Sequence, residues 1–399
     1  MIKKIGIVIL ILVASVSSLS AGSDWHFLCD AVDQHPEVLW GFLPTYIYGG
    51  VGYRGLQILD ENTTDIQLLF GAGYIQRKLW QDPQSGDDHH AGDDPLSMRE
   101  NPITYDVFVI DWGLRFRQGF FHSPWDAGSD LLTVTLGYEG KYEQNMNSMV
   151  LGKDRTNWSG PFPVQTLDSY LVGNDASHVY PDLQGDHRFL GTNFNLGFLI
   201  DLMTDDIETN DGLLFSLDFD WSPYELNAAL GGKADFYSIV FNAVGAKTLY
   251  QYKPKDINWF SLQLLDRVNI NWTSGDMVPV YAQKLGSLGR LVRGYANYSY
   301  NTELTIVNNL DLRMVSPPLG VKGIYVRLNL FFDIGYGAGR LYNSDVSKNL
   351  WIASTGAQIS LCVFDFIDLG FQVAYLINGH NYAKGDTPVS TGFFFFLDF

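Results

Sequence analysis

The sequence predicts an all-β protein, a transmembrane antiparallel β-barrel of about 14–16 strands. Three observations indicate this class. Apolar and polar residues alternate along many segments, which is the period of a strand with two different faces. The composition is rich in aromatic residues (15%) and in glycine (40 residues) but holds only 18% charged residues. The chain also begins with the features of an export signal.

The export signal is expected to occupy residues 1–21. Lys3 and Lys4 precede an apolar stretch that ends near Ala14, and small residues follow up to Ala21. The stretch is about ten residues long, too short to span a bilayer. Residues 22–40 are then expected to be a short periplasmic tail, and residues 41–399 to form the barrel.

The alternation also indicates what each face meets. In residues 104–118 the even positions are mostly large and apolar, whereas the odd positions include Asp111, Arg115 and Arg117. A dry core does not hold such charges without partners. A closed barrel with lipid outside and water inside accommodates both faces, and a secreted β-sandwich or propeller is the alternative.

Thirteen segments read as strands, and their connections differ in length. The longest gaps, 82–103 and 146–190, are expected on the outer side. Placing both there requires one more strand before residue 65, which a turn at Gly49 and Gly50 would supply. The segments are 42–59, 65–81, 104–119, 131–145, 191–203, 212–224, 235–253, 257–273, 302–315, 322–337, 350–364, 367–378 and 391–399.

The end of the chain has a pattern of its own. Alternate residues of the last segment are large and apolar, namely Phe393, Phe395, Leu397 and Phe399. This strand resembles the assembly signal of bacterial outer-membrane barrels. The resemblance implies an outer-membrane location, contact with outer-membrane lipid, and recognition by the barrel-assembly machinery and periplasmic chaperones during biogenesis.

Two short motifs lie about 40 residues apart. Val292, Arg293, Gly294 and Tyr295 stand in a long connection, 274–301, and a later strand carries Phe331, Asp333 and Gly335 in an F-x-D-x-G pattern. Asp333 lies on the polar face of its strand and should point inward. Arg293 offers a planar fork of donors that suits a carboxylate. Gly294 permits a tight backbone, and Gly335 leaves room beside the loop tip.

In their order and spacing, these motifs resemble those of the superfamily of the outer-membrane barrel-assembly insertase and the two-partner-secretion transporters (the bacterial surface antigen family). The resemblance implies that loop 274–301 folds into the lumen and that Arg293 pairs with a carboxylate on the inner wall. Family members carry polypeptide-transport-associated (POTRA) domains of about 75 residues each before the barrel. Here the expected tail has no room for one, so the chain is expected to be a barrel-only member.

The function implied by the resemblance is insertion or translocation of proteins at the outer membrane, with a separate periplasmic partner as one option. The alternative is a passive porin or a channel for small solutes or fatty acids. Acids expected on the inner wall would then favour cations; they are Glu139, Glu143, Asp218, Asp220 and Asp311.

Other classes of function have weaker support. The net charge of −18 argues against nucleic-acid binding. The segment from Asp87 to Asp94 holds four acids and two histidines, but it reads as a solvated outer loop, and a hydrolase built on it is a third hypothesis. Cys29 and Cys362 are expected to be incidental. The sequence therefore predicts no enzyme activity, no metal site and no cofactor.

Overall fold

The structure is a computed structural model of the 399-residue chain. It describes residues 35–43, 45–56, 58, 62–79, 103–122, 130–146, 183, 185–204, 211–254, 259–283, 287–295, 300–321, 323–341, 344–347, 350–363, 367–378 and 388–397. The signal peptide, Cys29, the Asp87–Asp94 segment and Phe399 lie outside these residues.

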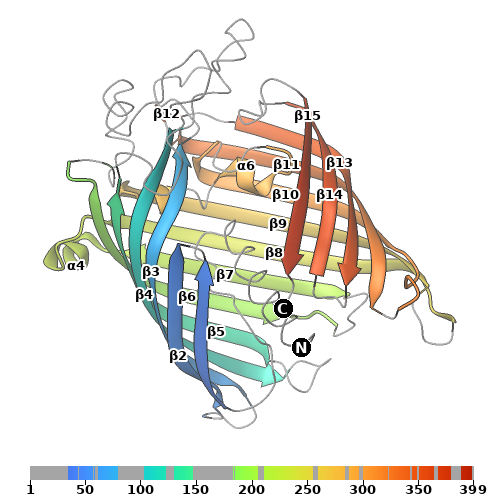
Figure 1. Ribbon diagram of the computed structural model, residues 1–399, viewed down its shortest axis with the longest axis horizontal. Coiled ribbons are helices and arrows are strands. Elements are labelled where there is room, and N and C mark those ends of the chain that lie inside the picture. Colours follow the sequence, from blue (N-terminus) through green and yellow to red (C-terminus); the bar gives the residue numbers. More distant parts are fainter. Residues whose placement is uncertain are drawn as a thin grey trace, which may run out of the picture.

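The described residues form one antiparallel sheet of 15 strands (Figure 1). Each strand pairs with the next in the chain, except that β12 pairs only with β11, so 14 strands follow one path from β1 to β15. The predicted all-β antiparallel fold is confirmed. The strands are β1 (His35–Leu43), β2 (Tyr46–Leu56), β3 (Thr64–Leu79), β4 (Ile103–His122), β5 (Asp130–Asn145), β6 (Arg188–Asp201), β7 (Gly212–Ser222), β8 (Asp235–Tyr252), β9 (Phe260–Met277), β10 (Thr302–Val315), β11 (Ile324–Leu341), β12 (Ser344–Ser347), β13 (Leu350–Val363), β14 (Ile367–Leu376) and β15 (Val389–Leu397).

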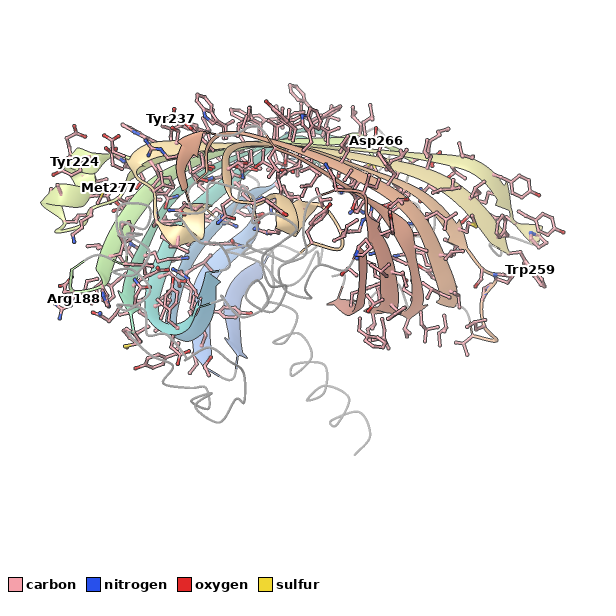
Figure 2. All side chains as sticks on the ribbon, turned by 90° about the horizontal axis from the view of Figure 1, so that it is seen from above. Arg188, Tyr224, Tyr237, Trp259, Asp266 and Met277 are labelled. Atoms are coloured by element: carbon pink, nitrogen blue, oxygen red, sulfur yellow. The ribbon has the colours of Figure 1, made fainter. Side chains whose placement is uncertain are left out.

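The sheet curves strongly, and its two faces differ. Figure 2 shows it as an arch whose end strands curl toward the concave side. The convex face exposes large apolar side chains on nearly every strand, including Phe70, Leu114, Phe219 and Trp272. The concave face holds most of the buried polar residues, such as Glu143 and Asp333. Apolar outside and polar inside is the pattern of a barrel that spans a membrane.

The connections at the two ends of the strands differ in length. One end carries the connections 80–102, 146–187 and 278–301, which join β3 to β4, β5 to β6 and β9 to β10. At the other end no connection exceeds the ten residues of 202–211. Because outer-membrane barrels have short inner turns and long outer loops, the long connections mark the outer end.

The first strands differ from the prediction. Gly49 and Gly50 do not form a turn, because both lie within β2 and pair with Trp40 and Leu39. The turn lies between Leu43 and Tyr46, so the additional strand is His35–Leu43, part of which was expected to be tail. Gly50 is required for packing, since a Cβ there would lie 2.7 Å from a methyl carbon of Leu69.

Three short helices are described, and each lies in a connection at the outer end. They are α4 (Tyr224–Ala229), α5 (Val280–Gln283) and α6 (Leu288–Leu291). The Asn227 side chain holds α4 against the sheet, because its Oδ1 accepts from the backbone amide (2.6 Å) and the hydroxyl (3.0 Å) of Thr192 on β6. Within the described ranges, no helix has the length and apolar character to cross a membrane.

Candidate functional site: a loop held against the concave wall

The connection between β9 and β10 folds back along the concave face. Its helix α6 contacts β10 and β11, and Figure 1 shows α6 lying against that part of the sheet. The base of this returning segment is closed by a β-bridge between Ser287 and Asn301 and by a 3.2 Å hydrogen bond from the Leu288 amide to the Tyr300 carbonyl. The loop is therefore a structured element inside the arch.

Apolar side chains attach this loop to the wall. One buried cluster joins loop residues with residues of β10, β13 and β14; it consists of Leu288, Val292, Tyr295, Tyr300, Val307, Ile352 and Leu376. Leu288, Val292 and Val307 have no exposed surface. Removing this apolar area from water favours the docked position of the loop.

Arg293 makes the main polar contact of the loop. Its Nε donates to Asp333 Oδ2 (2.8 Å) and its Nη2 donates to Asp333 Oδ1 (2.6 Å), so the carboxylate is held by two parallel bonds. The backbone amide of Arg293 donates to Asp333 Oδ2 as well (2.9 Å). Asp333 has no exposed surface. A paired, fully hydrogen-bonded geometry of this kind is what a buried carboxylate requires.

Three further wall residues surround the guanidinium. Asp311 Oδ1 lies 2.7 Å from Nη2 of Arg293, and Gln358 Oε1 accepts a bond from Nη1 (3.2 Å). The guanidinium carbon lies 4.0 Å from the ring centroid of Phe331, which adds a cation–π contact. One guanidinium therefore forms salt bridges with two nearly buried carboxylates, and both lose this partner if it is removed.

Two glycines make the close approach possible. Gly294 has a φ of +96°, and a Cβ there would lie 2.7 Å from the Ala374 Cβ. On the wall, a Cβ on Gly335 would lie 2.8 Å from Val292 Cγ2 and 2.9 Å from Leu288 Cδ2. Both positions therefore need glycine for the loop to dock, one for backbone conformation and contact, the other for contact alone.

Tyr295 ties the loop to the outer end of β13. Its hydroxyl donates to the Ala353 carbonyl (3.0 Å) and also contacts the carbonyl of Asn378, while its ring packs edge-on against Tyr300. Asn309 of β10 adds a bond from its side-chain amide to the Leu291 carbonyl (3.0 Å). The loop is thus held to the wall on the C-terminal side of α6.

Replacement of Tyr295 by Phe should lower the free energy of unfolding by about 1 kcal/mol, the usual net value of a hydrogen bond. The ring and its packing would remain. The measurement is a denaturant titration of the protein in phospholipid vesicles. Tyr375→Phe is the matched control because Tyr375 is exposed on the convex face. Equal effects of the two variants would show that the Tyr295 hydroxyl contributes nothing.

The remaining predicted residues lie elsewhere. Phe393 lies on β15 and is 87% exposed, and Phe395 and Leu397 belong to the same strand. Cys362 is buried, and its thiol donates to Asp368 Oδ1 (3.3 Å) on the adjacent strand. In the part of the chain that the structure describes, no group of three His, Cys, Asp or Glu side chains could hold a metal ion.

Sequence reasoning missed part of the site. Asp311 was expected to line the inner wall, but its contact with Arg293 was not anticipated. Gln358 and Asn309 were not singled out at all. The register of β10 against β11 would have revealed these contacts. In it, Asp311 lies opposite Phe331 and Asn309 lies opposite Asp333, so both lie beside the wall residues that contact Arg293.

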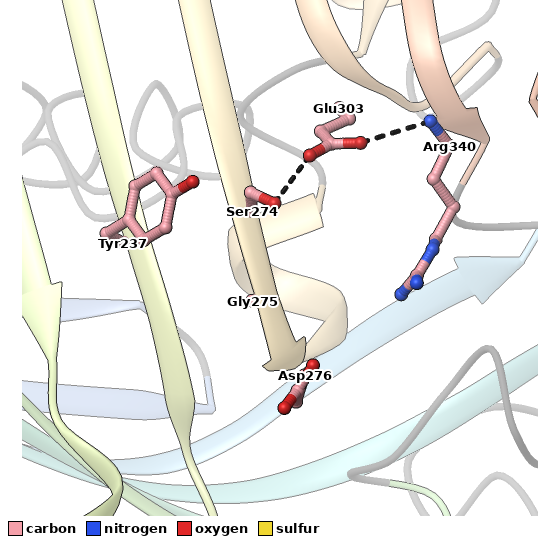
Figure 3. Close-up of a pocket in the computed structure, with 6 residues that line it drawn as sticks. All are labelled: Tyr237, Ser274, Gly275, Asp276, Glu303 and Arg340. Carbon is pink, nitrogen blue, oxygen red and sulfur yellow. Dashed lines mark hydrogen bonds between the residues drawn. The ribbon is translucent and has the colours of Figure 1, made fainter.

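A small recess lies near the outer end of β8–β11 (Figure 3). It is lined by Tyr237, Ser274, Gly275, Asp276, Glu303 and Arg340. Figure 3 shows Glu303 bridging two strands, since it accepts from the Ser274 hydroxyl and from the Arg340 backbone amide (3.2 Å). These bonds lie at a bulge in β10, where the register shifts between Thr302 and Leu304.

The fold and the docked loop together define an antiparallel sheet of the membrane-barrel type whose concave face is occupied by its own outer loop. No protein-family model matches the chain, and no curated protein matches it. Among solved structures it is similar to BamA from Haemophilus ducreyi lacking POTRA domains 1–3, with 12% identity and a TM-score of 0.49, covering 90% of this chain and 64% of that chain.

Two other solved structures are similar at a lower level. CdiB from Acinetobacter baumannii has 12% identity and a TM-score of 0.44, with 87% of this chain and 56% of that chain covered. A mutant of the ferric enterobactin receptor from Pseudomonas aeruginosa has 12% identity and a TM-score of 0.35, with 86% and 45% covered. This chain spans less than two thirds of each of these three proteins.

Proposed function

We propose that the chain is an integral outer-membrane barrel of the barrel-assembly insertase and two-partner-secretion transporter superfamily, and that it acts in insertion or translocation of proteins. The apolar convex face and the long outer connections support a place in the membrane. The motif residues Arg293 and Asp333, in contact on the concave wall, support the superfamily. The proposed role requires no cofactor and no enzymatic step.

The observation that carries the proposal is the docked loop. A passive pore needs an open path, whereas this barrel fills part of its concave face with residues 287–295 and fixes them through the partly buried guanidinium of Arg293. Such a loop suits a protein that stays sealed until a substrate or partner engages it. Capture of substrate is then the task of a separate periplasmic partner, and outer-membrane lipid is the surrounding solvent.

The direct test is an assembly assay. The purified chain is reconstituted in phospholipid vesicles, and a small outer-membrane barrel is added from urea. Protection of that barrel from protease then reports its folding over time. We expect faster folding than in vesicles that hold an unrelated closed barrel at the same protein-to-lipid ratio. Equal rates, with and without periplasmic extract as a source of partner, would contradict the proposed activity.

A second candidate function is a channel for small solutes, and the polar concave wall favours it. Charged side chains such as Arg117 and Glu139 keep part of their surface exposed there. The expected acid lining is partly neutralised, since Glu139 lies 3.3 Å from Arg115, and Glu143 pairs with Arg77. Asp218 and Asp220 on β7 are further acids of this wall that would favour cations.

Planar-bilayer recording separates the two candidates. With the loop docked, the intact protein should show little steady conductance, because the loop obstructs the lumen. The channel hypothesis instead predicts a large steady conductance whose reversal potential shows cation preference in a salt gradient. It also predicts that Asp218→Asn with Asp220→Asn reduces that preference, and a steady open pore would defeat the sealed-barrel account.

A further inference from the structure

An acidic residue lies on the convex, lipid-type face of β9. The outward side chains of this strand are otherwise apolar: Phe260, Leu262, Leu264, Val268, Ile270 and Trp272. Asp266 stands among them and is exposed. Figure 2 shows Asp266 on the convex side of the arch, between Tyr237 near one end of the strands and Trp259 near the other. The period-two pattern thus breaks at one position.

The depth of Asp266 follows from the aromatic residues around it. Phe260 packs near Tyr250 toward the inner end, and Trp272 packs edge-on against Tyr237 toward the outer end. Such aromatic groups mark the two interfaces of a membrane barrel. Asp266 lies six residues from both Phe260 and Trp272. At about 3.4 Å per residue and a tilt of about 45°, it is about 14 Å from each interface, close to the bilayer midplane.

The neighbours of Asp266 satisfy it only in part. On β10, the Asn308 side-chain amide donates to Asp266 Oδ1, and the same nitrogen lies 3.3 Å from the Arg267 carbonyl. Among the described residues, Asp266 has no ion pair and no other hydrogen bond. Its cross-strand partners are Gly245 and Leu310, which offer no polar side chain. One carboxyl oxygen therefore faces the hydrocarbon region without a partner.

A carboxyl group in this position is unfavourable in lipid alone, because hydrocarbon supplies neither water nor hydrogen bonds. Inside membranes, polar side chains on contacting surfaces act as points of association. Gly245 has no side chain and lies opposite Asp266. An added Cβ there would meet only Leu213 at 3.4 Å and the Asp266 carbonyl at 4.0 Å, so this position leaves space for a side chain of a neighbouring molecule. The surface therefore has the chemistry of a contact site.

We propose that the convex face around Asp266 and Asn308 binds a second copy of this chain within the bilayer. The surface is self-complementary, since an acceptor on β9 lies beside a donor on β10. About a two-fold axis at this pair, Asn308 of each copy donates to Asp266 of the other, so the same bond forms twice across the interface. The 3.3 Å contact with the Arg267 carbonyl is long, so that amide hydrogen is available for the partner.

The test measures association of the full chain in phospholipid vesicles by single-molecule photobleaching over a range of protein-to-lipid ratios. The wild type should pass from dimer to monomer on dilution in lipid. Asp266→Leu suits the apolar face and should still fold; it should weaken association at least tenfold, and Asn308→Leu should do the same. Leu136→Ala is the control, because Leu136 is exposed on the same convex face but lies on β5, away from the proposed contact, and it should leave association unchanged.

Two results would overturn the proposal. One is a wild type that stays monomeric at every ratio, or a dimer that Asp266→Leu and Asn308→Leu do not weaken. The other comes from a photo-crosslinker placed at Leu310 in native outer membranes. Crosslinks to a second copy support the proposal, whereas Asp266-dependent crosslinks to a different membrane protein assign the surface to that protein.

Discussion

Replacement of Arg293 by Ala is expected to lower the free energy of unfolding by about 3 kcal/mol, the lower end of the range for breaking a buried ion pair. The loss would arise because Asp333, with no exposed surface, and Asp311, with 4%, lose the salt-bridge partner that they share. The loop should also detach more readily from the concave wall. A denaturant titration in vesicles gives the stability, and bilayer conductance, expected to rise, reports the loop.

Three further variants test whether the stability loss of Arg293→Ala comes from the lost ion pair. Arg293→Lys keeps the charge but not the paired donors, so it should lose less stability than Arg293→Ala. Arg293→Ala combined with Asp333→Asn should recover part of the loss, because one uncompensated charge is removed. Arg188→Ala should change stability by less than about 0.5 kcal/mol, since that side chain is 64% exposed in a surface ion pair. A stable Arg293→Ala protein with unchanged conductance would contradict the pinned loop.

Replacement of Gly335 by Val should destabilise the protein by about 2 kcal/mol through overpacking. Valine is well suited to a strand, so the cost would come from the loop. A Cβ at this position meets Val292 and Leu288 at under 3 Å, and valine adds two methyl groups beyond that atom. We therefore expect the loop to move off the wall, with faster cleavage near α6 by added protease.

The control for this variant is Gly392→Val on β15. An added Cβ at Gly392 meets nothing within 4 Å, so this change should be neutral or slightly stabilising. Combining Gly335→Ala with Val292→Ala should restore the docked loop, because the space taken on the wall is released on the loop. Equal stability and equal protease cleavage of Gly335→Val and Gly392→Val would show that the loop does not lie against the wall at Gly335 in the membrane.

The direction of Asp333 could be predicted because strand periodicity fixes the face. A slip of one residue would exchange the two faces of β11. The alternation from Ile324 onward puts the apolar residues on one face only, so Asp333 must lie on the other, polar face. The same reasoning places Asp311 on the concave wall. It could not bring Asp311 to Arg293, because that contact depends on the register of β10 against β11, which a single sequence does not reveal.

The additional strand expected before residue 65 is present as β1, but its position and the turn after it were predicted wrongly, for a different reason. Residues His35–Leu43 include neighbouring apolar residues such as Val38 and Leu39, so the two faces are not distinguished and the alternation is lost. Gly49 and Gly50 resemble a turn signal, but in the structure Gly50 permits β2 to lie close to Leu69. Glycine marks either a turn or a close contact, and the sequence alone does not separate these.

The central claim is that the loop carrying Arg293 lies against the concave wall beside Gly335. A direct test places cysteines at Val292 and Gly335 in a background without Cys29 and Cys362. The Val292→Cys change removes a methyl group and so releases space for the Cβ that Gly335→Cys adds, which would otherwise lie 2.8 Å from Val292 Cγ2. With the loop docked, the γ atom of residue 292 is close enough to residue 335 for a disulfide. We expect the disulfide to form in intact cells. We also expect the single cysteine at residue 292, without its partner, to resist membrane-impermeant thiol reagents from outside. Free thiols at both positions, with residue 292 readily labelled from outside, would contradict the account.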